Sequence, residues 1–199
     1  MKRILLSCVA GSAALIGAGA PAADDTGAWY VSPMVQYTFL DTKRISNDNT
    51  GYQLGLGYNF APGWAAEING SIGSFKIPNS GASQQLDAYT LDVLYKFLPD
   101  STFRPYLLAG VGGITDRIAG GLEDHQAGVA EAGGGVWVGL GPQTGSTRFA
   151  LRAEAKYRIE FLGENAYAPR EPGDVVVSAG LLFMFGAPVA ATAIVAPPP

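Results

Sequence analysis

Cysteine and histidine are almost absent from this sequence of 199 residues: Cys8 is the only cysteine and His125 the only histidine. One cysteine cannot form an intramolecular disulfide or a cysteine-rich metal site. His125 follows Glu123 and Asp124, but neither this run nor Asp48 has a recognised spacing of metal ligands. No serine lies near the histidine in the sequence either. We therefore predict no catalytic residue, no metal site and no cofactor, and we do not expect the protein to be an enzyme.

Long apolar runs and an excess of positive charge are also missing. Beyond the first 22 residues, no stretch approaches the run of about 20 apolar residues that a membrane-spanning helix needs, which excludes a helical membrane protein. The net charge of −4 argues against nucleic acid as a partner. With 48% hydrophobic and 11% aromatic residues, the chain is nevertheless too apolar for a disordered protein.

The first 22 residues have the pattern of a cleaved signal peptide. Lys2 and Arg3 give a positive start, Ile4 to Ala20 form an apolar core, and Ala20-Pro21-Ala22 is a cleavage site of small residues. An uncleaved anchor is disfavoured because the run is short and rich in glycine and alanine. A lipoprotein at Cys8 is disfavoured because only four residues separate that cysteine from the basic start. We expect export, cleavage after Ala22, and a mature protein without a thiol.

Beyond this leader, apolar and polar residues alternate with the period of a β-strand, in segments of about ten residues. The alternation is clear in residues 87–97 and sharper in residues 149–161, where charged residues alternate with apolar ones. Residues 103–115 are ambiguous, because Leu107-Leu108-Ala109 interrupts the pattern. A soluble β-sandwich would show the same periodicity, so other features have to distinguish the two architectures.

The connections between these segments favour a membrane barrel. Short turns at residues 61–63, 99–102 and 141–146 alternate with longer polar loops at 41–50, 76–85, 116–126 and 162–173, as expected for periplasmic turns and external loops. The predicted fold class is all-β, an eight-stranded antiparallel up-and-down transmembrane β-barrel preceded by a signal peptide. Its strands are about residues 29–40, 51–60, 64–75, 86–98, 103–115, 127–140, 147–161 and 174–185.

The aromatic residues and glycines support the same architecture. Glycines on the polar face suit the crowded interior of a narrow barrel, and aromatics begin or end the apolar faces, as in the girdles at the two bilayer interfaces. The predicted girdle residues are Trp29, Tyr37, Phe39, Tyr52, Tyr58, Phe60, Tyr95, Phe97, Phe183 and Phe185.

The polar face would place charged residues inside the barrel. Eight strands enclose a lumen that side chains just fill, so we do not expect an open pore. Because an isolated buried charge is very costly, these charges must pair. The predicted interior network contains four acidic and four basic residues: Glu67, Asp92, Glu131 and Glu154, with Lys96, Arg152, Lys156 and Arg158.

Over about residues 27 to 186, the chain resembles the N-terminal transmembrane domain of the OmpA family. The resemblance rests on the order of five stretches: Trp29-Tyr30, Gly55-Leu56-Gly57-Tyr58, Pro105-Tyr106-Leu107-Leu108-Ala109-Gly110, Arg152-Ala153-Glu154 and Leu182-Phe183-Met184-Phe185-Gly186. It implies a structural outer-membrane protein of Gram-negative bacteria that contributes to envelope integrity and shows four loops at the cell surface. The implied partners are outer-membrane lipid, lipopolysaccharide and, during biogenesis, the barrel assembly machinery.

Some members of this family are proposed to gate the lumen by exchanging salt bridges. Glu67, Arg152 and Glu154 match the gating positions, whereas the positions of the lysine and the second glutamate hold Leu94 and Trp137. Structural pairing is therefore the favoured interpretation of these charges. The alternative functions are a surface barrel that mediates adhesion or host interaction, and a slow nonspecific solute channel.

Three segments follow from these patterns: a signal peptide over residues 1–22, the barrel over 23–186, and a Pro/Ala-rich periplasmic linker or tail over 187–199. In full-length members of the family, such a linker leads to a peptidoglycan-binding domain. Peptidoglycan is thus an expected partner only if such a domain follows. The sequence leaves open whether the protein ends naturally after the barrel.

Overall fold

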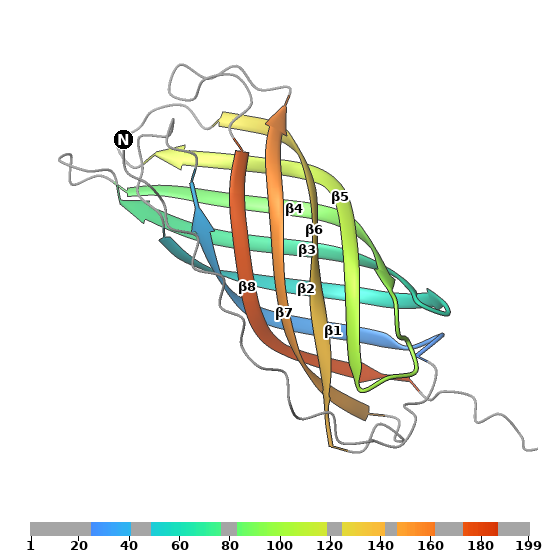
Figure 1. The fold of residues 1–199 in the computed structure, drawn as a ribbon. Helices are drawn as coiled ribbons and strands as arrows, with labels where there is room; N and C mark the ends of the chain where they lie inside the picture. The colour runs from blue at the N-terminus through green and yellow to red at the C-terminus, as the bar shows by residue number, and fades with distance from the viewer. Residues whose placement is uncertain are drawn as a thin grey trace, which may run out of the picture.

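The computed structural model describes residues 25–40, 49–76, 83–118, 125–141, 147–161 and 173–186. Each strand pairs antiparallel with its sequence neighbours, and the last strand returns to pair with the first, which closes a barrel (Figure 1). This confirms the predicted all-β, eight-stranded antiparallel up-and-down barrel and all eight predicted strands. The strands are β1 (Trp29–Phe39), β2 (Asn49–Ala61), β3 (Trp64–Lys76), β4 (Ser83–Lys96), β5 (Phe103–Ile118), β6 (His125–Leu140), β7 (Thr147–Phe161) and β8 (Gly173–Phe185).

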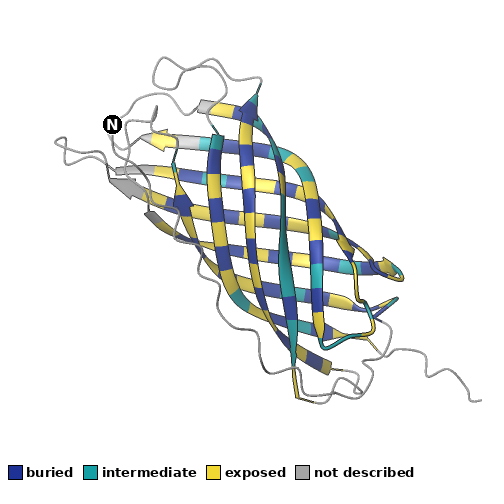
Figure 2. Ribbon diagram, viewed as in Figure 1, coloured by how far each residue is buried: buried dark blue, intermediate teal, exposed yellow. Residues whose placement is uncertain are grey.

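Burial alternates along most of the strands, as the period-2 pattern requires (Figure 2). The exceptions lie in β5, where Gly113 and Ile114 are both buried, and in β6, where residues 133–136 are all partly buried. In β7 each residue from Thr147 to Glu160 switches between exposed and buried. In β4 the apolar residues Tyr89, Leu91 and Val93 are exposed, whereas Thr90 and Asp92 are buried. The barrel is therefore apolar outside and largely polar inside, the reverse of a soluble sandwich.

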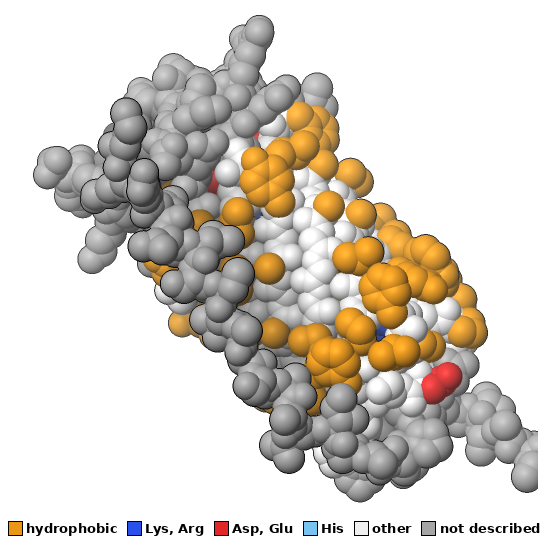
Figure 3. Space-filling view, viewed as in Figure 1, with side chains coloured by type: hydrophobic (Ala, Val, Ile, Leu, Met, Phe, Trp, Pro, Cys, Tyr) orange, Lys and Arg blue, Asp and Glu red, His pale blue; other side chains and the backbone are white. Residues whose placement is uncertain are grey.

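The outer wall is covered mainly by hydrophobic side chains (Figure 3). On the face shown there, acidic and basic side chains scarcely reach the surface of the described residues. Such a surface would aggregate in water but suits contact with lipid. No helix among the described residues is both long and apolar enough to cross a membrane.

The two ends of the barrel differ in their connections. At one end, here called the short-turn end, Pro62 and Gly63 join β2 to β3, and the turn around residues 97–102 joins β4 to β5. Gly63 has a φ of 76°, a conformation that residues with a Cβ rarely adopt. The opposite end, the loop end, carries the longer connections, of which residues 41–48, 77–82, 119–124 and 162–172 lie outside the described ranges.

The seam between β1 and β8 closes the cylinder and is less regular than the other strand pairs. Its ladder runs from Trp29 to Val31 and resumes at Met34, so it omits Ser32 and Pro33. Pro33 has no N–H group to donate. The Ser32 hydroxyl donates instead to the Leu181 carbonyl at 3.2 Å. A side-chain hydrogen bond thus replaces part of the backbone ladder at the seam.

The predicted leader (residues 1–22) and tail (residues 187–199) lie outside the described residues. Both remain predictions.

A test of which face meets lipid is to replace Leu91 with arginine. Leu91 is exposed in the middle of β4, and an arginine near the bilayer midplane should lower the free energy of unfolding by about 2–4 kcal/mol. Reversible unfolding in urea with lipid vesicles measures this loss. The neighbouring inward variant Thr90→Ser keeps its hydroxyl and should be nearly neutral. Equal effects of the two substitutions would contradict the observed facing.

Candidate functional site

The lumen is filled by charged and polar side chains that the strand alternation points inward. Strand β7 supplies most of the cations, because Arg148, Arg152, Lys156 and Arg158 all occupy its buried positions. Their carboxylate partners come from β3, β6, β7 and the segment before β1. All eight predicted interior charges are buried in the described structure.

The centre of the lumen is organised by Arg152, whose side chain is fully buried. Its Nη1 lies 2.5 Å from Glu67 Oε2, and its Nη2 lies 2.7 Å from Glu154 Oε2. Tyr106 donates its hydroxyl to the same Glu154 oxygen at 2.8 Å, and the Gln53 amide donates to the other at 2.8 Å. Such complete satisfaction is what a buried ion pair requires to be tolerated.

A second cluster lies nearer the loop end and is built around Glu131. Lys156 Nζ lies 2.7 Å from Glu131 Oε1, and Arg158 Nε lies 2.9 Å from Oε2. Lys156 also lies 3.8 Å from Glu154, so it joins this cluster to Arg152 and its partners. We call the set Glu67, Glu131, Arg152, Glu154, Lys156 and Arg158 the central network.

A third cluster closes the short-turn end, and the sequence did not reveal it. Asp25 precedes β1 and is 1% exposed. Its carboxylate pairs with Arg104, with Arg148 at 2.5 Å and with Lys96 at 3.4 Å. We call these four residues the mouth cluster. Of them, only Lys96 was predicted to be an interior charge.

The segment around Asp25 is also fixed through its backbone. Gly27 donates its N–H to the Asn59 carbonyl at 2.7 Å, and Asn59 donates its own N–H to the Ala28 carbonyl at 3.0 Å. Lys96 Nζ in turn donates to Asn59 Oδ1 at 2.6 Å. Residues 25–28 therefore fold back into the mouth of the barrel, although they belong to no strand.

Two apolar layers flank the central network, and the first lies between that network and the mouth cluster. Toward the short-turn end, Tyr30, Leu94, Tyr106, Leu108 and Trp137 belong to one buried cluster, in which the rings of Tyr30 and Trp137 meet edge to face with centroids 5.0 Å apart. Toward the loop end, a second buried cluster contains Leu86, Ala88, Ile114, Ala127 and Val129.

Inward glycines make room for the large lumen side chains. A Cβ at Gly57 would lie 2.1 Å from the Tyr30 ring, and one at Gly135 would lie 2.5 Å from the Tyr106 hydroxyl. Any larger residue at either position would collide with a buried aromatic ring. A cavity beside Gln36, Arg158 and Asp174, which Leu86 and Ile114 of the second apolar cluster also line, measures about 10 Å³, room for about one water.

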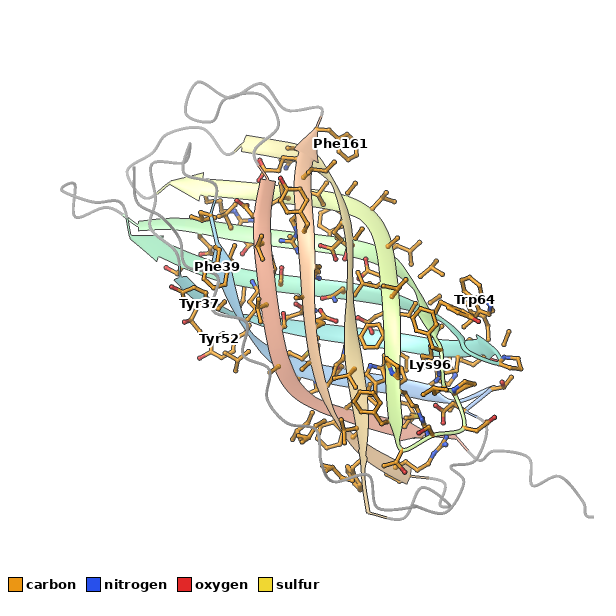
Figure 4. All side chains as sticks on the ribbon, in the orientation of Figure 1. Tyr37, Phe39, Tyr52, Trp64, Lys96 and Phe161 are labelled. Carbon is orange, nitrogen blue, oxygen red and sulfur yellow. The ribbon has the colours of Figure 1, made fainter. Side chains whose placement is uncertain are left out.

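The predicted girdle residues all lie on the outer wall, at the two ends of the strands. Tyr37, Phe39 and Tyr52 lie toward the loop end, and the other seven toward the short-turn end, where Trp64 also lies (Figure 4). Neighbouring rings contact one another, with centroids 4.9 Å apart for Trp29 and Tyr58 and 4.8 Å apart for Trp64 and Tyr95. Trp64, Phe103 and Phe149 are further exposed aromatics at this end that the prediction omitted.

Leu94 and Trp137 stand at the two positions where a salt-bridge gate would need a lysine and a second glutamate. Leu94 and Trp137 are buried within the apolar layer, so position 94 offers Glu67 no alternative cation. Among the described residues, no group of three or more histidine, cysteine, aspartate or glutamate side chains could hold a metal ion. His125 begins β6, and Glu123 and Asp124 lie outside the described ranges.

Comparison with known proteins identifies a matching family and several similar solved structures. Residues 8–186 match the family described as outer membrane protein beta-barrel domain. Neisserial surface protein A has a similar structure, with a TM-score of 0.61 and 16% identity, over 78% of this chain and 97% of that chain. The N-terminal barrel domain of Pseudomonas aeruginosa OprF gives a TM-score of 0.49 and 20% identity, over 80% of this chain and 98% of that chain. The attachment invasion locus protein Ail of Yersinia pestis gives a TM-score of 0.43 and 14% identity, over 79% of this chain and 99% of that chain. No curated protein matches the chain.

Proposed function

The chain belongs to the outer membrane protein beta-barrel domain family, and from this premise we propose that it is a structural component of the outer membrane that supports envelope integrity without conducting solutes. The family match also confirms the resemblance to the OmpA barrel domain. The outward apolar residues would contact membrane lipid and lipopolysaccharide. The four long connections would lie at the cell surface, and the barrel assembly machinery would insert the chain.

The observation that carries this proposal is the filled lumen. A solute that crossed the barrel would have to pass the mouth cluster, the layer around Trp137, the central network and the second apolar cluster in turn. The Arg152, Glu67, Glu154 and Lys156 side chains have no exposed surface. Opening a path would break several buried charge pairs at once, and breaking even one such pair is strongly destabilising.

The proposal is tested with the full-length protein in planar lipid bilayers and in cells. In bilayers we expect no conductance steps beyond those of lipid alone; regular steps would support the slow channel instead. In cells that lack the gene, we expect increased sensitivity to detergents and bulky antibiotics, restored by the wild-type protein.

A loop-shortened variant separates the structural role from surface binding. Residues 41–48, 77–82, 119–124 and 162–172 would be replaced by short turns, which leaves the strands and the lumen unchanged. If the barrel itself supports the envelope, this variant should restore resistance as well as the wild type. Failure to restore resistance, despite normal insertion, would contradict the structural role and favour a function of the loops.

A further inference from the structure

Asp92 differs from the other acidic residues of the central lumen because it has no cationic partner. Glu67, Glu131 and Glu154 each contact arginine or lysine at 2.5–2.9 Å. Asp92 is only 1% exposed, yet no arginine or lysine of the described residues forms an ion pair with it. An ionised carboxylate in this position would bear most of its desolvation cost uncompensated.

The surroundings of the Asp92 carboxyl leave little room for a bound ion. Its Oδ1 has no hydrogen-bond partner in the described structure. This oxygen packs directly over the backbone of Gly110 on the neighbouring strand, where a Cβ would come within 1.8 Å of it. Protein backbone thus occupies one side of the carboxyl, where a counterion would otherwise approach.

The other oxygen, Asp92 Oδ2, meets the hydroxyl of Thr90. The distance from Thr90 Oγ1 to Asp92 Oδ2 is 3.2 Å, and the distance from the same hydroxyl to Glu131 Oε1 is also 3.2 Å. A threonine hydroxyl has one proton and can donate to only one of these two acceptors. Both contacts become hydrogen bonds only if one of the carboxyl groups donates a proton to the hydroxyl.

The neighbouring charges identify which carboxyl group holds that proton. Glu131 is paired with Lys156 and Arg158, which favours its ionised form. Asp92 faces Glu67 across the β3–β4 ladder and Glu131 across Thr90, and the adjacent position on β5 is the uncharged Gly110. Lys156 of β7 is already held by Glu131 and Glu154.

We propose that Asp92 is a proton-binding site in the lumen wall: it donates a proton to Thr90, and Thr90 donates its own to Glu131. The three side chains then form a hydrogen-bonded chain with one negative charge, and only the neutral carbonyl oxygen Asp92 Oδ1 is left without a partner. Loss of the proton would leave two carboxylates facing each other across one hydroxyl, with a third, Glu67, on the next strand. The barrel therefore contains a pH-sensitive element that is independent of any channel or surface role.

The sign of the pH effect follows from linkage. On this proposal the folded barrel still holds a proton on Asp92 at near-neutral pH, whereas an aspartate of the unfolded chain has already lost its proton in the acid range, at about pH 4. This contribution to stability is complete in acid and is lost as the pH rises through the titration of Asp92 in the folded state. In the variant Asp92→Asn the amide can donate to Thr90 at every pH, so the difference in stability between wild type and variant should change in favour of the variant as the pH rises.

The direct test is infrared spectroscopy of the full-length protein in lipid vesicles near neutral pH, with aspartate carboxyl groups labelled with carbon-13. We expect the carbonyl band of a protonated aspartic acid, its loss in Asp92→Asn, and its retention in the control Asp87→Asn. Asp87 lies on the same strand but outside, where it pairs with Arg117. The label separates aspartate from glutamate, so the wild-type spectrum is informative even if a variant folds poorly.

Two results would overturn the proposal. One is a wild-type spectrum without a protonated aspartic acid at neutral pH. The other is a band that persists in folded Asp92→Asn, which would place the proton elsewhere. Loss of the band on titration to alkaline pH, together with the predicted change in relative stability, would support it.

Discussion

Replacing Arg152 with methionine is expected to lower the stability of the folded barrel by about 3–5 kcal/mol, the usual cost of removing one partner from a buried ion pair. Arg152 holds both Glu67 and Glu154, and all three side chains are fully buried. Methionine fills much of the same volume but leaves two carboxylates with their main counterion removed. The free energy of unfolding in urea with lipid vesicles measures the loss.

Two further variants make this result specific to buried charge. Arg117→Met removes an arginine that is 53% exposed and pairs with Asp87 on the outside of the barrel. Such exposed ion pairs contribute only about 0–1 kcal/mol to stability. The triple variant Glu67→Gln, Arg152→Met, Glu154→Gln removes both carboxylates with the arginine and should recover most of the lost stability. If Arg152→Met cost no more than Arg117→Met, the central network would not stabilise the lumen as described.

Replacing Asp25 with asparagine should be destabilising to a similar extent, about 3–5 kcal/mol. One carboxylate contacts three buried cations from three strands, Lys96 of β4, Arg104 of β5 and Arg148 of β7. Asparagine keeps the size of the side chain but removes the charge. Stability falls because the mouth of the barrel then holds converging cations without this shared partner.

The same variant has a local signature. Because Asp25 holds residues 25–28 in the mouth, its loss should increase hydrogen exchange of the Gly27 amide, which donates to Asn59, while amides in the middle of β7 stay protected. Asp87, whose side chain is 25% exposed and pairs with Arg117, provides the matched control Asp87→Asn. Unchanged protection of Gly27 in folded Asp25→Asn would show that the backbone contacts hold the segment without the carboxylate.

The sequence predicted the strands well because one physical requirement governs them all. Each strand must present apolar residues to one side and polar residues to the other, so strong alternation in β4 and β7 identified both the strands and their facing. The prediction failed to orient β5 because the lumen is not uniformly polar. Leu108 points inward into the apolar layer of Leu94 and Trp137, and this inward leucine stands between the outward Leu107 and Ala109.

The mouth cluster could not be recognised from alternation at all. Asp25 lies before the first strand, where no period-2 pattern exists, and its partners are far away in the sequence. Arg104 and Arg148 are the second residues of β5 and β7, where a charge is equally compatible with a solvated turn. Their convergence depends on the closure of the cylinder, which brings β4, β5 and β7 around one point.

The seam between β1 and β8 has a consequence for the order in which the barrel forms and opens. These two strands are the most distant in sequence, so their pairing pays the largest loop-closure entropy and should come last. Because Ser32 and Pro33 are not paired with β8, fewer backbone hydrogen bonds have to break at this seam than along a continuous ladder. A sheet opened at this junction would have two free edges, and each could template a strand from another chain. The junction that completes the cylinder is thus also the place where a half-formed barrel would present unpaired strand edges.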